Sequence, residues 1–286
     1  MDEDPLTSSV LSTLLEACNA VQNALNLLDD WGPAGTRPGQ YKLDLAADAA
    51  ACEVLHRAGL NVLSEESGLT TSSASGAGLA KFEAGLAKSG EVVEKDGLAS
   101  MASDHTKTST LLAILDPIDG STNAHRGIPF YSTSICVIDD LGPLVAVVVN
   151  QATGVKYEAI RGRGARRDGV ELKTSVCTLL SKAIVGISGF PTTHPGWAQF
   201  RAFGAASLEF CAVAEGTLDG YMVVGGSSLF VWDYLAGLLI CEEAGGWGAD
   251  ILGADLVARD DSYRRPAVAG TKELLDSLIQ ASSLLD

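Results

Sequence analysis

The sequence lacks any apolar run of the roughly 18 to 20 residues that a helix needs to cross a bilayer. Its first residues, Met-Asp-Glu-Asp-Pro, are acidic, unlike the basic start of a secretory signal peptide. We therefore expect a cytoplasmic protein without a membrane partner.

Basic residues are also scarce. The chain has 20 Lys and Arg against 36 Asp and Glu, for a formal net charge of −16. Phosphate backbones are held mainly by Lys and Arg, so we expect no nucleic-acid scaffold as a partner. A carboxylate-rich pocket would repel a phosphorylated ligand unless bound cations reverse the local field.

Soft metal ligands show no pattern. The six cysteines are scattered without a C-x-x-C pair, mostly among apolar neighbours, which predicts buried free thiols. The four histidines are dispersed as well. His125 lies near the most informative segment of the chain, but we expect it at the surface because hard cations prefer oxygen ligands.

That segment is the octet Asp-Pro-Ile-Asp-Gly-Ser-Thr-Asn at residues 116–123. It follows the short apolar run 111–115, which predicts a buried strand. Asp116 and Asp119 supply hard oxygen ligands suited to Mg²⁺. Between them Pro117 stiffens the backbone, so the carbonyl of Ile118 can face the same ion.

The second half of the octet suits an anion. Gly120 removes a side chain that would block a ligand, and the amides that follow can point at a phosphate. Ser121 adds a hydroxyl beside them. Asp-Pro and Asp-Gly are also ordinary turn signals, so these dipeptides alone do not decide the chemistry.

The rest of the chain interleaves helices and strands, which predicts an α/β or mixed α+β fold. Expected helices cover 6–29, 45–58, 197–203, 206–214, 233–244 and 272–285, and expected strands cover 111–115, 132–138, 144–150, 155–160 and 183–189. A hairpin turn is expected at 139–143. Residues 68–78 are rich in Ser, Thr and Gly and precede a helix-like stretch at 79–86, so we expect a surface loop or flap there.

Three segments in this order resemble the inositol monophosphatase family of Mg²⁺-dependent, lithium-sensitive phosphatases. They are Ser64-Glu65-Glu66-Ser67, the octet, and Val231-Trp232-Asp233-Tyr234-Leu235-Ala236-Gly237. A weaker match begins at Gly204-Ala205-Ala206. Only residues 68–110 have no clear counterpart.

The resemblance implies a layered α-β-α-β-α sandwich. It places an amino-terminal lobe at 1–150, with 68–110 as a variable loop or flap, and a carboxyl-terminal lobe at 151–286. It also implies a homodimer, two or three Mg²⁺ per site, and inhibition by lithium. The expected activity is hydrolysis of a small phosphorylated metabolite by metal-activated water.

The resemblance further implies roles for individual residues. The first Mg²⁺ would be held by Glu65, Asp116 and the Ile118 carbonyl, and the second by Asp116, Asp119 and Asp233. Ser121 would orient the attacking water, with Glu65 as a further catalytic residue and Asp48 as the partner of Ser121. The implied substrate contacts are Asp119, Gly120, Ser121, Thr122, Gly204, Ala205, Ala206 and Asp233.

Each ligand also has a structural interpretation, because Glu65 and Glu66 can be a solvated pair and Asp233 can cap a helix. The substrate is less determined than the reaction. Inositol-specific relatives carry a Glu where this chain has Gly226, and a small polar residue where it has Ala205. A pocket without those polar partners should discriminate poorly for that polyol.

Three alternatives to this activity therefore stay open. The first two are a nucleotide 3′-phosphatase and a histidinol-phosphate phosphatase of the same superfamily. The third is a binding or regulatory module whose site has decayed. An Asp after Gly204, which histidinol-phosphate-specific relatives tend to carry, is absent from this sequence.

Overall fold

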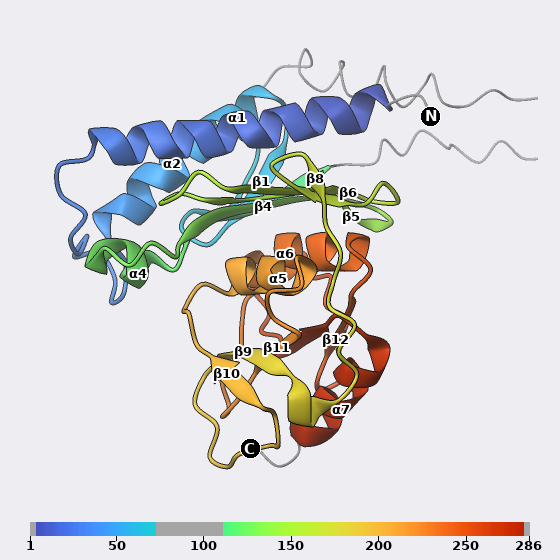
Figure 1. The fold of residues 1–286 in the computed structure, drawn as a ribbon. Helices are drawn as coiled ribbons and strands as arrows, with labels where there is room; N and C mark the ends of the chain where they lie inside the picture. Colours follow the sequence, from blue (N-terminus) through green and yellow to red (C-terminus); the bar gives the residue numbers. More distant parts are fainter. Residues whose placement is uncertain (1–3, 73–110, 283–286) are drawn as a thin grey trace, which may run out of the picture.

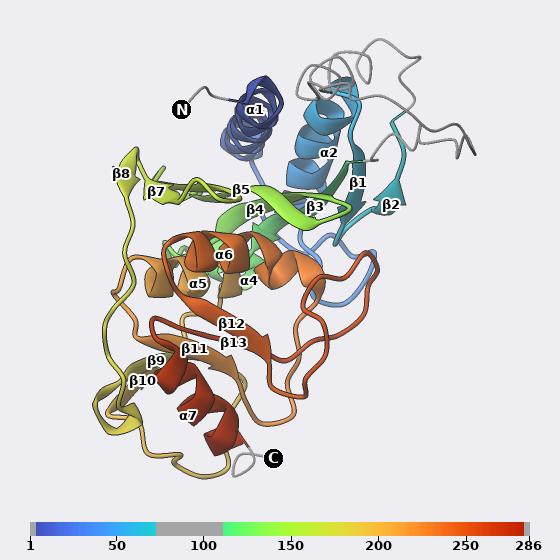
Figure 2. The ribbon, with the colours of Figure 1, turned by 90° about the vertical axis from the view of Figure 1, so that its right-hand side faces the viewer.

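The computed structural model describes residues 4–72 and 111–282 and has five layers (Figures 1 and 2). Helices α1 and α2 cover one face of an eight-stranded sheet, and α5 and α6 fill the space between that sheet and a five-stranded sheet. Helix α7 covers the outer face of the second sheet. The predicted α-β-α-β-α sandwich is confirmed.

The first sheet has the strand order β2-β1-β3-β4-β5-β6-β7-β8. Strand β1 runs parallel to β3, and every other neighbouring pair is antiparallel. The strands are β1 (Asn61–Ser64), β2 (Gly68–Thr70), β3 (Leu112–Asp119), β4 (Ser132–Asp139), β5 (Gly142–Asn150), β6 (Lys156–Ile160), β7 (Ala165–Arg167) and β8 (Val170–Glu171).

The second sheet has the order β10-β9-β11-β13-β12, with β9, β10 and β11 parallel to one another. Its strands are β9 (Ile184–Ser188), β10 (Gln199–Arg201), β11 (Gly220–Val223), β12 (Trp247–Asp250) and β13 (Pro266–Ala269). The helices are α1 (Pro5–Leu27), α2 (Lys42–Arg57), α4 (Ser121–Arg126), α5 (Ala206–Ala214), α6 (Val231–Glu243) and α7 (Lys272–Ser282), with a short 3-10 turn at Leu180–Lys182.

Strand alternation divides the core between the layers. Ala113 and Leu115 of β3 pack under α1 and α2, whereas Ile114 faces the opposite way, toward α5 and α6. Because successive strand residues point to opposite faces, β3 is covered on both sides, and all eight of its residues are buried. Its carboxyl end, which carries the octet, is therefore rigidly held between two helical layers.

Most predicted elements are confirmed, including the hairpin between β4 and β5. One expected element is wrong. Residues 197–203 contain the strand β10 rather than a helix, because Trp197, Phe200 and Phe203 recur every three residues and imitate a helical face. The first sheet continues through the expected strand at 155–160 to Glu171, and the division into two lobes at residue 150 stays a prediction. The helix-like stretch at 79–86 lies outside the described residues.

All six cysteines are free and five of them are buried, as expected. None of the helices in residues 4–72 and 111–282 is both long and apolar enough to span a membrane.

Candidate active site

Glu65 and Asp116 are brought together by the pairing of two parallel strands. In the register of β1 and β3, Ser64 lies opposite Leu115. The next residues in both strands are therefore neighbours at the carboxyl edge of the sheet. A hydrogen bond of 3.2 Å from the Glu65 amide to the Leu115 carbonyl fixes this arrangement.

A register shift between Asp116 and Asp119 interrupts the pairing of β3 with β4. Pro117 and Ile118 consequently have no direct Cα partner on β4. The Thr133 hydroxyl donates to the Pro117 carbonyl at 2.9 Å. Such bulges are frequent next to active sites because they redirect side chains, and this one turns Asp119 toward the second helical layer.

Asp119 joins the octet to helix α5. Its Oδ2 accepts the Ser207 amide at 2.7 Å and the Ser207 hydroxyl at 2.5 Å. Its Oδ1 accepts the Ala206 amide at 3.2 Å. Both amides belong to the first turn of α5, so Asp119 caps that helix from across the molecule.

Gly120 makes the turn from β3 into α4 in the left-handed region, with φ +84°. A Cβ built there would stand 3.0 Å from the Ala205 Cβ and 3.1 Å from the Gly204 carbonyl oxygen. Only glycine fits both the backbone conformation and the close approach. Helix α4 then begins at Ser121.

Asp233 occupies the first turn of α6, where its Oδ2 accepts the Phe230 amide at 2.7 Å. The structural interpretation of this residue as a helix cap is therefore correct. Helix α6 packs against β3, β4 and β5. The same packing brings the Asp233 carboxylate close enough to Asp119 and Glu65 for mutual repulsion to raise its pKa, after burial as the larger cause.

Four carboxylates near the octet, Glu65, Asp116, Asp119 and Asp233, have raised pKa values, and burial is the largest cause for each. Burial, followed by repulsion from Glu65, Asp119 and Asp233, raises the pKa of Asp116 well above its usual value. Burial, followed by repulsion from neighbouring carboxylates, raises the pKa of Glu65 to about 7. Asp119 reaches a pKa of about 6, because burial outweighs the hydrogen bonds from Ser207 and Ala206. Without a bound cation, burial therefore disfavours the charged form of these carboxylates.

This donor set has the chemistry that Mg²⁺ requires. Its members are carboxylates, and Oδ1 of Asp116 is buried without any hydrogen-bond partner. As they stand, no three His, Cys, Asp or Glu side chains within residues 4–72 and 111–282 are gathered into a ready metal site. Asp119 and Asp233 are held by backbone amides. The residues fit a divalent cation in the type of their donor atoms, and cation binding requires the carboxylates to converge.

A cleft of about 850 Å³ opens beside these residues. Glu65 and Ser121 lie in its wall, and apolar side chains of Leu63, Phe230 and Trp232 line it further along. Its volume falls in the range of roughly 300 to 1,000 Å³ that small-molecule sites occupy. Thr122 is exposed nearby, with its hydroxyl 3.4 Å from that of Tyr41.

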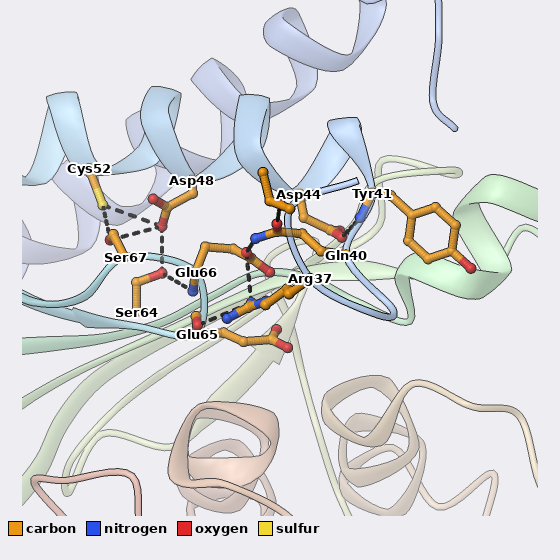
Figure 3. A network of polar contacts seen from close by, with 11 residues as sticks. Arg37, Gln40, Tyr41, Asp44, Asp48, Cys52, Ser64, Glu65, Glu66 and Ser67 are labelled. Atoms are coloured by element: carbon orange, nitrogen blue, oxygen red, sulfur yellow. Dashed lines mark hydrogen bonds and ion pairs between the residues drawn. The ribbon is translucent and has the colours of Figure 1, made fainter. Parts of the chain in front are cut away.

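The opposite rim is built by the loop before α2 (Figure 3). Arg37 forms an ion pair of 2.7 Å with Glu66, and Gln40 donates to the same carboxylate. Glu66 is thus held by Arg37 and Gln40, whereas the Glu65 carboxylate points away from α2. The two adjacent glutamates therefore have different surroundings, and a solvated pair is the wrong description.

The predicted pairing of Asp48 with Ser121 is not formed. Oδ1 of Asp48 accepts the Ser64 hydroxyl at 2.5 Å and the Ser67 hydroxyl at 3.3 Å, and Cys52 lies beside it (Figure 3). Asp48 therefore supports the turn that carries Glu65. Asp44, one helical turn earlier, lines the cleft together with Ser121.

Asp44, Arg37 and Gln40 are cleft residues that the sequence interpretation missed. Burial is the largest cause that raises the pKa of Asp44 to about 7, with a smaller contribution from Glu66. Its Oδ1 is buried without a partner. The available signal was that α2 begins at Lys42, which places Asp44 in its first turn.

Gly204, Ala205 and Ala206 are brought to the octet, but the described walls of the main cleft do not include them. They pack against Gly120 or donate to Asp119 instead. Gly226, where the family resemblance led us to look for a Glu, has φ +73° and open space around its Cβ position.

Comparisons with known proteins identify the family of the chain. The model of the inositol monophosphatase family matches residues 82–284. An inositol-1-monophosphatase of Rhizobium meliloti is 37% identical over 156 residues, which cover 49% of this chain and 57% of that protein. A Nus factor SuhB of Pasteurella multocida is 30% identical over 187 residues, covering 60% of this chain and 68% of that one.

The first of these relatives is thus matched over little more than half its length. Among solved structures, a hypothetical Pyrococcus horikoshii protein with similarities to inositol-1 monophosphatase superposes with a TM-score of 0.75 at 19% identity. The superposition covers 96% of this chain and 98% of that one, and it supports the fold. From the family match over most of its length, we conclude that this chain belongs to the inositol monophosphatase family.

Proposed function

We propose that the protein is a Mg²⁺-dependent phosphomonoesterase that hydrolyses a small phosphorylated metabolite. The observation that carries this proposal is the gathering of four carboxylates with raised pKa values, Glu65, Asp116, Asp119 and Asp233, around a buried, unpartnered Asp116 Oδ1, with burial as the largest cause of each shift. Such an arrangement is unfavourable without a cation and useful with one. Family membership supports the same reaction class.

Glu65, Asp116, Asp119 and Asp233, with the Ile118 carbonyl, would hold the metal. Bound divalent cations supply charge neutralisation for the phosphate and activation of the attacking water. The chain itself contributes position. Strand pairing holds Glu65 beside Asp116, and the left-handed Gly120 turn leads into α4, where the amides of Ser121 and Thr122 would meet the phosphate.

Ser121 is the hydroxyl that would orient the water, and Asp44, which lines the same cleft, is the carboxylate that would accept a proton there. Asp48 is occupied by Ser64 and Ser67. Its role is to hold the segment that carries Glu65.

The substrate alcohol would occupy the cleft, whose wall combines the apolar side chains of Leu63, Phe230 and Trp232 with polar ones that include Arg37, Gln40 and Arg259. Gly226, where inositol-specific relatives carry a Glu, offers no side chain for a hydroxyl contact. We therefore favour a sugar, polyol, nucleotide or histidinol phosphate without a strict requirement for inositol.

Phosphate release tests this proposal. The purified protein is assayed with inositol 1-phosphate, sugar, histidinol and nucleotide phosphates in the presence and absence of Mg²⁺. We expect Mg²⁺-dependent turnover that Asp116→Asn lowers by at least about 100-fold, because the substitution removes a charged donor from the ligand set. Absence of turnover with every ester and every divalent metal would reject the enzyme.

A binding or regulatory module is the second candidate. Its support is that several relatives carry the name Nus factor SuhB rather than that of an enzyme. Metal binding without turnover in the same assay would favour this candidate.

A further inference from the structure

The peptide group of Phe203 is held at both of its polar atoms. Its N–H donates to Oε1 of Glu209 at 2.7 Å, and its carbonyl accepts the side-chain amide of Asn123 at 2.7 Å. Glu209 belongs to α5 and Asn123 to α4 of the octet, so the two bonds join the layers. We call these three residues the Phe203 clamp.

The clamp immediately precedes the segment from Gly204 to Ser207, which contacts the octet. Gly204 and Ala205 pack on Gly120, at distances that leave no room for a side chain there. The amides of Ala206 and Ser207 then donate to Asp119. The position of the Phe203 peptide therefore sets how closely this segment approaches a predicted metal ligand and the phosphate turn.

Asn123 is well suited to this task, because its amide nitrogen also donates to the Phe130 carbonyl at 2.8 Å. Phe130 and Phe203 pack together with ring centroids 4.8 Å apart. One amide group thus ties two loops to the last residue of the octet.

Glu209 is harder to explain as a purely structural residue. It is fully buried, and its Oε2 has no hydrogen-bond partner. Burial raises its pKa to about 8, so it is mainly uncharged near neutral pH. A buried acid with an unsatisfied oxygen costs free energy relative to an apolar side chain. The bond to the Phe203 amide is the interaction that an apolar residue would not supply.

We propose that Glu209 and Asn123 are positioning residues, which hold the Phe203 peptide so that the segment from Gly204 to Ser207 keeps Asp119 and the Gly120 turn in their working positions. The expected effect on catalysis rests on the proposed phosphatase function. The expected effect on the position of the segment does not, because hydrogen exchange of its amides can be measured without turnover.

Hydrogen exchange tests the expected effect on the position of the segment. In Glu209→Ala we expect the amides of Phe203, Ala206 and Ser207 to exchange at least about tenfold faster than in the unaltered protein. Glu209→Gln should restore protection, because its amide oxygen accepts the same N–H. Unchanged exchange at Ala206 and Ser207 in a folded Glu209→Ala protein would overturn the proposal.

A matched control separates position from general loss of stability. Glu243 also accepts backbone amides, those of Gly162 and Gly164, at 2.7 and 2.8 Å, but it does so at the opposite end of α6 from Asp233. Glu243→Ala should lower stability without altering exchange at Ala206 and Ser207. Equal effects of the two alanine variants on those amides would contradict a specific clamp.

Kinetics and calorimetry test the consequence for the site. We expect Glu209→Ala to lower kcat and weaken Mg²⁺ binding by about 10- to 100-fold, the usual effect of removing support behind a metal ligand. Glu209→Gln should stay within about threefold of the unaltered protein in both measurements.

Asn123→Ala provides a second variant should Glu209→Ala fail to fold. Because both residues act through one peptide, the double variant should lose less than the product of the single effects. Full multiplicativity would overturn the proposal. If the unaltered protein binds Mg²⁺ but turns over no ester, the proposed function fails, while hydrogen exchange and Mg²⁺ calorimetry still decide the clamp.

Discussion

The two glycines that flank helix α4 allow the contribution of packing around the octet to be measured through matched substitutions. Gly120 precedes the helix with φ +84°, and Gly127 follows it with φ +73°. An alanine at either position pays the cost of a left-handed conformation, about 1 to 2 kcal/mol. The two sites therefore share one penalty and differ in their surroundings.

The different surroundings of the two glycines predict unequal losses in the free energy of unfolding. A Cβ at Gly127 meets nothing within 4 Å, whereas one at Gly120 meets three atoms at 3.0 to 3.2 Å, two of them backbone oxygens. Backbone cannot rotate away, so overpacking adds about 1 to 3 kcal/mol at Gly120. We expect Gly127→Ala to lower the free energy of unfolding by about 1 to 2 kcal/mol and Gly120→Ala by about 2 to 5 kcal/mol.

Urea denaturation followed by tryptophan fluorescence measures both variants. In the phosphate-release assay, Gly120→Ala should lose at least about 100-fold, because displacement of the turn by an ångström is enough for such a loss. Gly127→Ala should remain close to the unaltered protein. Equal destabilisation of the two variants, or full activity of Gly120→Ala, would refute the packing argument.

Two further predictions concern the carboxylates. Without metal, the raised pKa values of Glu65, about 7, and Asp119, about 6, mean that the folded protein binds more protons than the unfolded chain. The stability that these groups contribute is therefore present at low pH and lost as the pH rises through these values. Thermal denaturation at about pH 5 and about pH 8 should show Mg²⁺ stabilising the protein more at the higher pH; an equal or smaller effect there would contradict this assignment. The second prediction is that Asp44→Asn lowers phosphate release by at least about tenfold, because Asp44 lines the same cleft as Ser121 and is the proposed proton acceptor. Asp48→Asn should mainly lower stability, and the reverse ranking of the two variants would restore the pairing of Asp48 with Ser121.

Much of the site could be predicted because its residues are consecutive or follow paired strands. The octet is local, and parallel strands end at the same edge, so Glu65 and Asp116 meet once β1 and β3 are recognised. Asp233 was recognisable in the Trp-Asp segment as a residue of the helix start, and its role as a ligand stays a prediction.

Whether Asp44 or Asp48 is the carboxylate in the cleft with Ser121 could not be decided from the sequence. Residues four apart lie on the same face of a helix, about 6 Å apart along its axis. Which of them reaches the cleft depends on where α2 starts and how it docks on the sheet. The Phe203 clamp was equally hidden, because its three residues are distant in the chain and one contributes only its backbone.

The central claim is that carboxylates from three separate segments surround one divalent metal site. Crystals grown with Mn²⁺ and phosphate test it directly through the anomalous scattering of the metal. We predict anomalous density beside Asp116, with Glu65, Asp119 and Asp233 as the other carboxylates around it. No metal there at saturating Mn²⁺, or metal bound only elsewhere on the chain, would contradict the claim.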